Sequence, residues 1–293
     1  MKKITCILIV LLCLLNVMVG LTGQTGVPAF AGNQGLLGRL TKLNVDEDTL
    51  NADIADFFFS HMPFSGYKFY DTLDSMVMAL QSGIIAGLST DEFTKDYIIS
   101  RNKGFVEYKN PEAPSHILAY AMMLRKSDAE LCGKITGVIR DMRADGTLAS
   151  LKKQYIDDVI AGIEPKAVVP DVIMSEAIEG AETLKIALTG DRPPMDYFSE
   201  AGKPIGFNTA IVSEIVKRLG LNVEFISVDS GARAVALSSG AADIVFWSEN
   251  GNFNNRENAD VEDQPEGTVI TEPYITGKLS YIVLASSPLA VRD

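Results

Sequence analysis

The second half of the chain alternates short apolar runs with amphipathic stretches, and this rhythm restricts the fold more than any other feature. Three apolar runs predict strands: LKIALTG (184–190), NVEFISV (222–228) and ADIVFW (242–247). The stretch 205–220 has helical spacing and ends at Gly220, and Gly231–Ser239 predicts a second helix. This βαβαβ order predicts a parallel sheet that binds its ligand at the carboxyl ends of the strands.

The first half contains a similar succession of elements. Residues 66–70 and 84–89 predict strands, each followed by a helix, at 71–82 and 91–101, with Asp71 and Asp91 as N-caps. Three further elements follow: an extended segment at 115–126, a helix from Ser127 to Met142 and a last helix at 148–155. A capped helix is expected at 43–62, with Asp46 as its N-cap. The order of helices and strands predicts an α/β fold.

Two segments carry a resemblance to a known family. Residues 183–285 run from TLKIALTGDRPPMDYF through ALSSGAADIVFWS to TEPYITGKLSYIVLASS. They resemble the opening lobe of the extracellular solute-binding proteins of ABC transporters, amino-acid type (family 3). Residues 67–155, with MALQSGIIAGLSTDEFTKDYI and AYAMMLRKSDAELCGKITGVI, resemble the closing stretch of that family, which ordinarily comes second. The resemblance implies a periplasmic-binding-protein-like fold of two α/β lobes with mostly parallel sheets and a hinge, in circularly permuted order.

The resemblance also implies a division of the chain. Residues 1–31 are expected to be a signal peptide, 32–115 an abbreviated lobe 2, and 116–162 a returning segment whose helices pack on lobe 1. A linker at 163–182 precedes lobe 1 at 183–280, and 281–293 crosses towards lobe 2. Because both chain ends of the family domain lie in one lobe, a linker of this length joins them easily.

Two charged residues match the family's ligand contacts. The resemblance implies that Asp91, in GLSTDEFT, binds an ammonium group and that Arg256, in NNRENADVED, binds a carboxylate. Guanidinium and carboxylate pair bidentately, and a buried charge needs a partner. Two plain structural roles remain open: Asp91 as only an N-cap, and Arg256 as a solvated loop charge.

The chain departs from the family where aromatic side chains normally enclose the ligand: Arg192 and Ser230 stand there instead. Further candidate contacts lie at or after the ends of the predicted strands: Arg192 itself, Asp191, Tyr197, Arg233, Trp247 and Ser248. Trp247 offers a stacking face or is a core anchor. Arg233 lies in the first turn of its predicted helix, where a cation is disfavoured, so it is held by an anion or exposed. Asp191 can also pair locally with Arg192.

The composition of the chain limits the classes of molecule that it is expected to bind. A formal net charge of −12 argues against nucleic acid, because the chain has no basic stripe to replace phosphate counterions. We therefore expect a small-molecule solute and, by the resemblance, an ABC permease in the membrane. We expect a monomer, with a domain-swapped dimer as the alternative that a permuted order allows.

The N-terminus predicts export. Lys2 and Lys3 precede an apolar run at 4–19, and Ala29-Phe30-Ala31 offers a cleavage site, although an uncleaved anchor is the alternative. We expect a secreted, extracytoplasmic location. After cleavage only Cys132 remains, so no internal disulfide is expected; its helical pattern predicts a buried core thiol. The sequence predicts no catalytic residue, metal ligand or cofactor.

Three functions are compatible with this sequence. The first is a secreted receptor that delivers an amino acid or related carboxylate to an importer after hinge closure. The second is an enzyme on the same fold, such as a dehydratase, because fold alone does not decide function. The third is a ligand sensor or surface module without transport. The resemblance favours the first, which is not an enzyme.

Overall fold

The structure, a computed structural model, describes residues 29–33, 67–70, 72–109, 117–163, 177–229, 232–250 and 266–290. Only the backbone is described for 29–33, 67–69 and 247–250. Three expected features therefore lie outside or largely outside the described residues: the signal segment, the helix at 43–62 and the linker. Among the described residues no helix is long and apolar enough to cross a bilayer.

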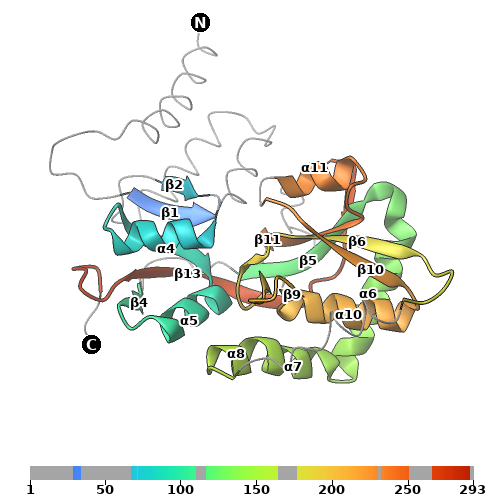
Figure 1. Cartoon of the computed structure of the whole chain (residues 1–293), viewed down its shortest axis with the longest axis horizontal. Coiled ribbons are helices and arrows are strands. Elements are labelled where there is room, and N and C mark those ends of the chain that lie inside the picture. Colours follow the sequence, from blue (N-terminus) through green and yellow to red (C-terminus); the bar gives the residue numbers. More distant parts are fainter. Residues whose placement is uncertain are drawn as a thin grey trace, which may run out of the picture.

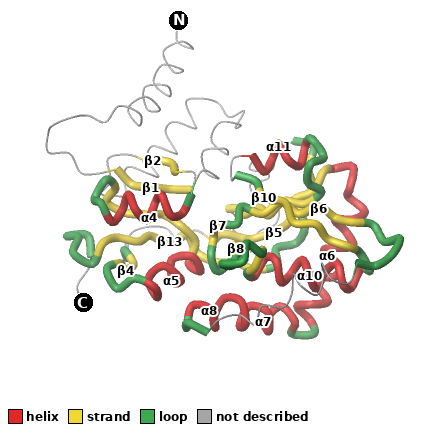
Figure 2. Tube along the Cα trace, in the orientation of Figure 1, coloured by secondary structure: helices red, strands yellow, loops and turns green. Residues whose placement is uncertain are grey.

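Ten of the described strands form one mixed sheet that spans two lobes (Figures 1 and 2). The order along its main path is β10-β6-β11-β5-β13-β3-β1-β2, with β12 beside β5 and β4 beside β13. The pairs β10–β6, β6–β11, β3–β1 and β1–β2 are parallel, whereas β5 and β13 run antiparallel to their neighbours. The expected α/β class is confirmed.

The larger lobe contains the predicted βαβαβ segment. Its strands are β5 (Ile117–Arg125), β6 (Thr183–Leu188), β10 (Asn222–Ser227), β11 (Ile244–Asn250) and β12 (Thr268–Ile270). Its helices are α6 (Ala129–Ala144), α7 (Thr147–Lys152), α8 (Asp158–Ile160), α10 (Phe207–Leu219) and α11 (Arg233–Ser238), with the 3-10 turn η1 (Lys126–Asp128) and the π turn η2 (Lys153–Asp157). In Figure 1, α11 lies above the sheet and α6, α7, α8 and α10 lie below it.

The smaller lobe contains β1 (Ala29–Asn33), β2 (Tyr67–Tyr70), β3 (Ile85–Asp91), β4 (Phe105–Glu107), α4 (Leu73–Gln81) and α5 (Glu92–Arg101). Strand β13 (Ile275–Leu284) belongs to both lobes. It pairs with β5 over Ile275–Lys278 and with β3 from Leu279 onward. A single continuous strand therefore joins the two halves of the sheet.

Two predicted helix boundaries, one start and one end, lie where the sequence predicts them. α5 begins after its N-cap Asp91, and α10 ends at Gly220, which adopts the left-handed conformation with φ 67°. Others differ. The N-cap of α4 is Thr72, whose side chain accepts from the Ser75 N–H, rather than Asp71, and the predicted last helix continues through η2 and α8 to Ile160.

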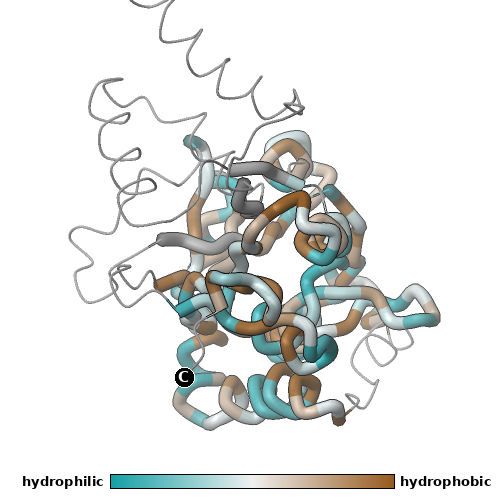
Figure 3. The backbone as a smooth tube through the Cα atoms, turned by 90° about the vertical axis from the view of Figure 1, so that its left-hand side faces the viewer, coloured by the Kyte–Doolittle hydropathy of each residue, from teal (hydrophilic) through white to brown (hydrophobic). Residues whose placement is uncertain are grey.

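Each lobe has a hydrophobic core of its own. The larger cluster lies between the sheet and α6–α10 and includes Cys132, which is buried as predicted. A second cluster lies around α4 and β3 in the smaller lobe, and a third lies under α11. Seen from the side of the smaller lobe, hydrophobic and hydrophilic stretches alternate along the chain (Figure 3), as expected for helices and strands with one face towards a core.

Candidate functional site

A small three-stranded sheet follows β6 and lies at the junction of the lobes (Figure 2). It comprises β7 (Asp191–Arg192), β8 (Asp196–Phe198) and β9 (Pro204–Ile205). The chain enters it through Gly190, which has φ 71°, and a Cβ on Gly190 would lie 1.9 Å from Cε2 of Phe198. The left-handed backbone favours glycine here, and a larger residue would also force the exposed Phe198 ring to move.

The central contact of the site is an ion pair between the lobes. Nη2 of Arg192, on β7 of the larger lobe, lies 3.0 Å from Oδ2 of Asp91, at the end of β3 in the smaller lobe. The Asp91 side chain is fully buried (0% exposed) and that of Arg192 is 17% exposed. Because both charges are largely removed from water, each depends on the other for stabilisation.

Asp91 is also the N-cap of α5. Its Oδ1 accepts from the Thr94 backbone N–H at 2.9 Å, and its Oδ2 accepts from the Thr94 hydroxyl at 2.9 Å. The predicted capping role is therefore confirmed, and the same carboxylate also forms the ion pair with Arg192. Binding of a ligand's ammonium group by Asp91, the other role open from the sequence, stays a prediction. Its charge also favours the helix N-terminus, where the backbone dipoles are positive.

The neighbouring residue on β7 makes a second contact with the smaller lobe. Oδ2 of Asp191 accepts from the backbone N–H of Leu73, the first residue of α4, at 3.3 Å. Asp191 and Arg192 thus contact the N-terminal ends of two different helices. The Asp191 carboxylate meets the first N–H of α4, and the Arg192 guanidinium meets the residue that caps α5. The local Asp191–Arg192 pairing considered from the sequence is not among the described ion pairs.

A buried polar chain supports β7 from the side of the larger lobe. Asp196, on β8, accepts from the Thr189 hydroxyl at 2.8 Å, the Gly190 N–H at 2.9 Å and Nδ2 of Asn208 at 2.9 Å. The Tyr274 hydroxyl donates to Oδ1 of Asn208 at 2.8 Å. This chain of hydrogen bonds fixes the loop that carries Arg192.

Tyr120, in the middle of β5, lies beside this network without joining it. Its hydroxyl is buried and has no hydrogen-bond partner within the described part of the chain. Burial, and then the Asp91 carboxylate, raise the pKa of Tyr120 well above its ordinary value. A buried hydroxyl that lacks a partner is uncommon and costs stability.

The charges around Arg192 are mostly negative. Burial alone would lower the pKa of Arg192, but Tyr120, Asp91 and the other nearby acids, Asp196 and Asp191, outweigh it and raise that pKa. Arg192 is therefore a permanent cation in this site. Burial, and then the Asp196 carboxylate, raise the pKa of Tyr274, so its hydroxyl stays protonated and able to donate.

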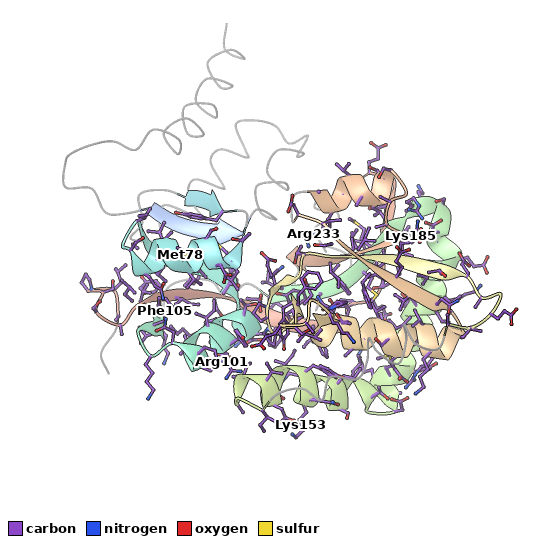
Figure 4. All side chains as sticks on the ribbon, viewed as in Figure 1. Met78, Arg101, Phe105, Lys153, Lys185 and Arg233 are labelled. Carbon is purple, nitrogen blue, oxygen red and sulfur yellow. The ribbon has the colours of Figure 1, made fainter. Side chains whose placement is uncertain are left out.

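Apolar contacts hold the lobes together beside the ion pair. Phe93 of α5 is buried in the core cluster of the larger lobe, with its ring centroid 6.3 Å from that of Tyr120. Gly277 of β13 makes room for it, because a Cβ there would lie 2.8 Å from the Phe93 ring. At the other end of α5, Nη2 of Arg101, labelled in Figure 4, donates to the Val159 carbonyl oxygen at 2.9 Å.

The remaining predicted site residues lie on other loops of the larger lobe. Arg233 begins α11, shorter than the predicted helix, and its Nη1 donates to the Phe246 carbonyl oxygen at 2.9 Å; Figure 4 labels it at the end of α11. Tyr197 lies on β8, half-buried. Trp247 and Ser248 lie on β11, opposite Ala121 and Tyr120 of β5, with only their backbone described. Arg256 lies outside the described residues.

The structure thus brings Asp91, Arg192 and Asp191 together at the lobe junction. Sequence reasoning missed Tyr120, Asp196 and Asn208 as their neighbours. One signal was available: Tyr120 is the only polar-tipped side chain in the apolar run ILAYAMML. No cluster of three or more histidine, cysteine, aspartate or glutamate side chains that could hold a metal ion occurs among the described residues.

Comparison with known proteins gives one sequence match. Residues 184–288, less than half of the chain, match the model of a family described as bacterial extracellular solute-binding proteins, family 3. This match supports a ligand-binding role. No curated protein sequence matches the chain significantly.

Solved structures give coarser likenesses. The periplasmic aliphatic sulphonate binding protein SsuA from Escherichia coli is 9% identical with a TM-score of 0.37, over 91% of this chain and 67% of that one. The ligand-binding core of GluR0 in complex with L-glutamate is 10% identical with a TM-score of 0.39, over 92% and 89%. Full-length CbnR complexed with its target DNA is 14% identical with a TM-score of 0.41, over 92% and 68%.

Proposed function

We propose that this chain is a secreted substrate-binding protein that holds a small polar solute, an amino acid or a related carboxylate, between its two lobes. The observation that carries the proposal is the largely buried ion pair between Arg192 and Asp91, which lies where the loop after β6 meets the end of β3. The match of residues 184–288 to a solute-binding family supports it independently. The role is binding, without a chemical step.

The same proposal covers the order of the elements. We infer that the chain is a circular permutation of the family domain, with the closing-lobe elements first and the opening lobe at 183–280. The position of the family match in the second half supports this order, and the passage of β13 from β5 to β3 supports a hinge near Lys278. Hinge closure on the solute would then present the closed chain to an ABC permease.

The ligand contacts remain part of the proposal. Asp91 is proposed to bind the solute at the lobe junction, with Arg192 and Asp191 beside it. The further proposed contacts are Arg233, Tyr197, Trp247, Ser248 and Arg256. Asp191 and Arg192 follow β6, and Arg233 follows β10, at the carboxyl ends of these parallel strands, which is where parallel sheets bind ligands.

The test is thermal unfolding of the chain against a panel of amino acids and small carboxylates. A ligand at a hundredfold its dissociation constant adds about 2.7 kcal/mol to the free energy of unfolding. We expect at least one compound to raise the midpoint, and Asp91→Asn to remove or weaken the effect. Arg140→Met, which breaks a pair with Glu272 within the larger lobe, is the matched control and should leave the effect in place. A well-folded chain that responds to no compound would contradict the proposal.

A further inference from the structure

The cation that pairs with the Asp91 carboxylate is Arg192, a residue of the same chain. Oδ2 of Asp91 accepts from Nη2 of Arg192, and its remaining contacts are both to Thr94. With the Asp91 side chain 0% exposed, no cation from solution can reach the carboxylate while Arg192 stays in place. A solute that uses Asp91 must therefore displace Arg192 rather than add to it.

The charged groups around Arg192 are carboxylates, so this position favours a cation. Asp91, Asp191 and Asp196 all act on its charge. If Arg192 moved away, three carboxylates would be left together, which is strongly unfavourable unless another cation replaces it. The unpartnered Tyr120 hydroxyl lies against the same carboxylate. It can accept a hydrogen bond from a small cationic group that the larger, fork-shaped guanidinium does not supply.

Displacement of Arg192 would also remove polar contacts that β7 makes with the smaller lobe. Arg192 and Asp191 belong to the larger lobe, whereas Asp91 and Leu73 belong to the smaller one. The two contacts are adjacent on β7, so movement of this one strand breaks both. Breaking a buried ion pair without replacing it is costly, which keeps the lobes together in the absence of solute.

We propose that Arg192 is an internal competitor for Asp91: a latch that holds the lobes together in the absence of solute, and that yields to a solute carrying an ammonium or guanidinium group. The solute half of this inference rests on the proposed function; the latch half does not. Arg192 is accordingly a specificity-determining residue, since its hold on Asp91 sets how strongly a cationic solute must bind.

The latch is tested by measuring the distance between the lobes without any solute. Spin labels are placed on Met78→Cys of α4 and Val235→Cys of α11, which are 68% and 65% exposed, in a chain whose native cysteines are replaced by alanine. Pulsed electron resonance then compares this chain with the same chain carrying Arg192→Met or Asp91→Asn. These two substitutions break the same ion pair from opposite sides. If one variant fails to fold, the other still tests the latch.

We expect both substitutions to shift the distances to longer, broader distributions, and Arg140→Met to leave them unchanged. Unchanged distances in folded Arg192→Met or Asp91→Asn would overturn the latch. Affinity for a series of amines, amino acids and guanidinium compounds tests the competition. A latch that weakens apparent affinity tenfold corresponds to about 1.4 kcal/mol, so Arg192→Met should bind a cationic solute about tenfold more tightly.

The outcomes separate the two proposals. Weaker binding by Arg192→Met would make Arg192 a direct solute contact and overturn the competition. Longer distances in the variants together with no binding by any chain would keep the latch and contradict solute binding. Binding of carboxylates that lack a cationic group, unaffected by Arg192→Met, would keep solute binding and overturn the competitor.

Discussion

Replacing Asp91 by alanine removes two interactions at once, and their sizes can be separated. The first is the N-cap of α5, worth about 1 kcal/mol for a typical cap. The second is the ion pair with Arg192, whose loss leaves a guanidinium that is only 17% exposed without its partner. Breaking a buried pair costs about 3–5 kcal/mol, and partial exposure places this one at the low end. We therefore expect Asp91→Ala to lower the free energy of unfolding by about 4 kcal/mol in total.

The chain offers a matched control in Thr72→Ala. Thr72 caps α4 by accepting from the Ser75 N–H at 3.2 Å, it is exposed, and its side chain carries no charge. Its loss should cost about 0.5–1 kcal/mol, the cap contribution alone. The difference between the two variants measures the ion pair.

Urea unfolding followed by the fluorescence of Trp247, the only tryptophan, measures both variants. With a slope of roughly 3 kcal/mol per molar urea, Asp91→Ala should lower the midpoint by about 1 M or more. The double variant Asp91→Ala/Arg192→Ala should recover part of the loss, since it leaves no unpaired charge. If Asp91→Ala costs no more than Thr72→Ala, the ion pair contributes nothing and the reasoning fails.

Three further predictions concern the neighbours of this pair. Tyr120→Phe removes a hydroxyl without a partner and should be neutral or stabilising, whereas Tyr274→Phe deprives Asn208 of a donor and should cost about 1 kcal/mol in urea unfolding. The pKa of both tyrosines is raised in the folded chain, so their contribution to the free energy of unfolding is fully present below about pH 10 and is lost as the pH rises above that value. Above about pH 10, the unfolding midpoint should therefore fall less steeply with pH in either Phe variant. Gly190→Ala should cost more than the roughly 1–2 kcal/mol of left-handed backbone, because its Cβ meets the Phe198 ring; a cost that Phe198→Ala does not reduce would contradict this.

Local signals in the sequence predict local structure well in this chain. The boundary between β3 and α5 at Asp91 follows from an apolar run ending in a capping residue, and the end of α10 follows from Gly220. The two predictions that were wrong, the N-cap of α4 and the end of the last helix, also concern local structure. Asp71 and Thr72 are both good caps, and only the backbone geometry decides between them. The continuation of the last helix to Ile160 depends on packing against α5, which no local pattern reports.

The pairing of Asp91 with Arg192 could not be predicted in this way, because the two residues are 101 positions apart and lie in different lobes. Hydrophobic period and capping rules describe neighbours along the chain, whereas this contact depends on how β13 sets one sheet half beside the other. Tyr120 was hidden for a related reason: its apolar surroundings predict a buried strand correctly but do not reveal which charge its hydroxyl meets.

The two site residues that the sequence treated separately are physically one feature. Asp91 matched the family pattern, while Arg192 broke it by standing where an aromatic side chain is expected. An aromatic ring at that position would leave the Asp91 charge for a solute to neutralise. An arginine neutralises the charge from within, and the surrounding acids, Asp191 and Asp196, keep it there. The departure from the pattern therefore changes the proposed role of the matching residue: Asp91 is bound to its own chain first, and under the proposed function a solute would reach it only in competition.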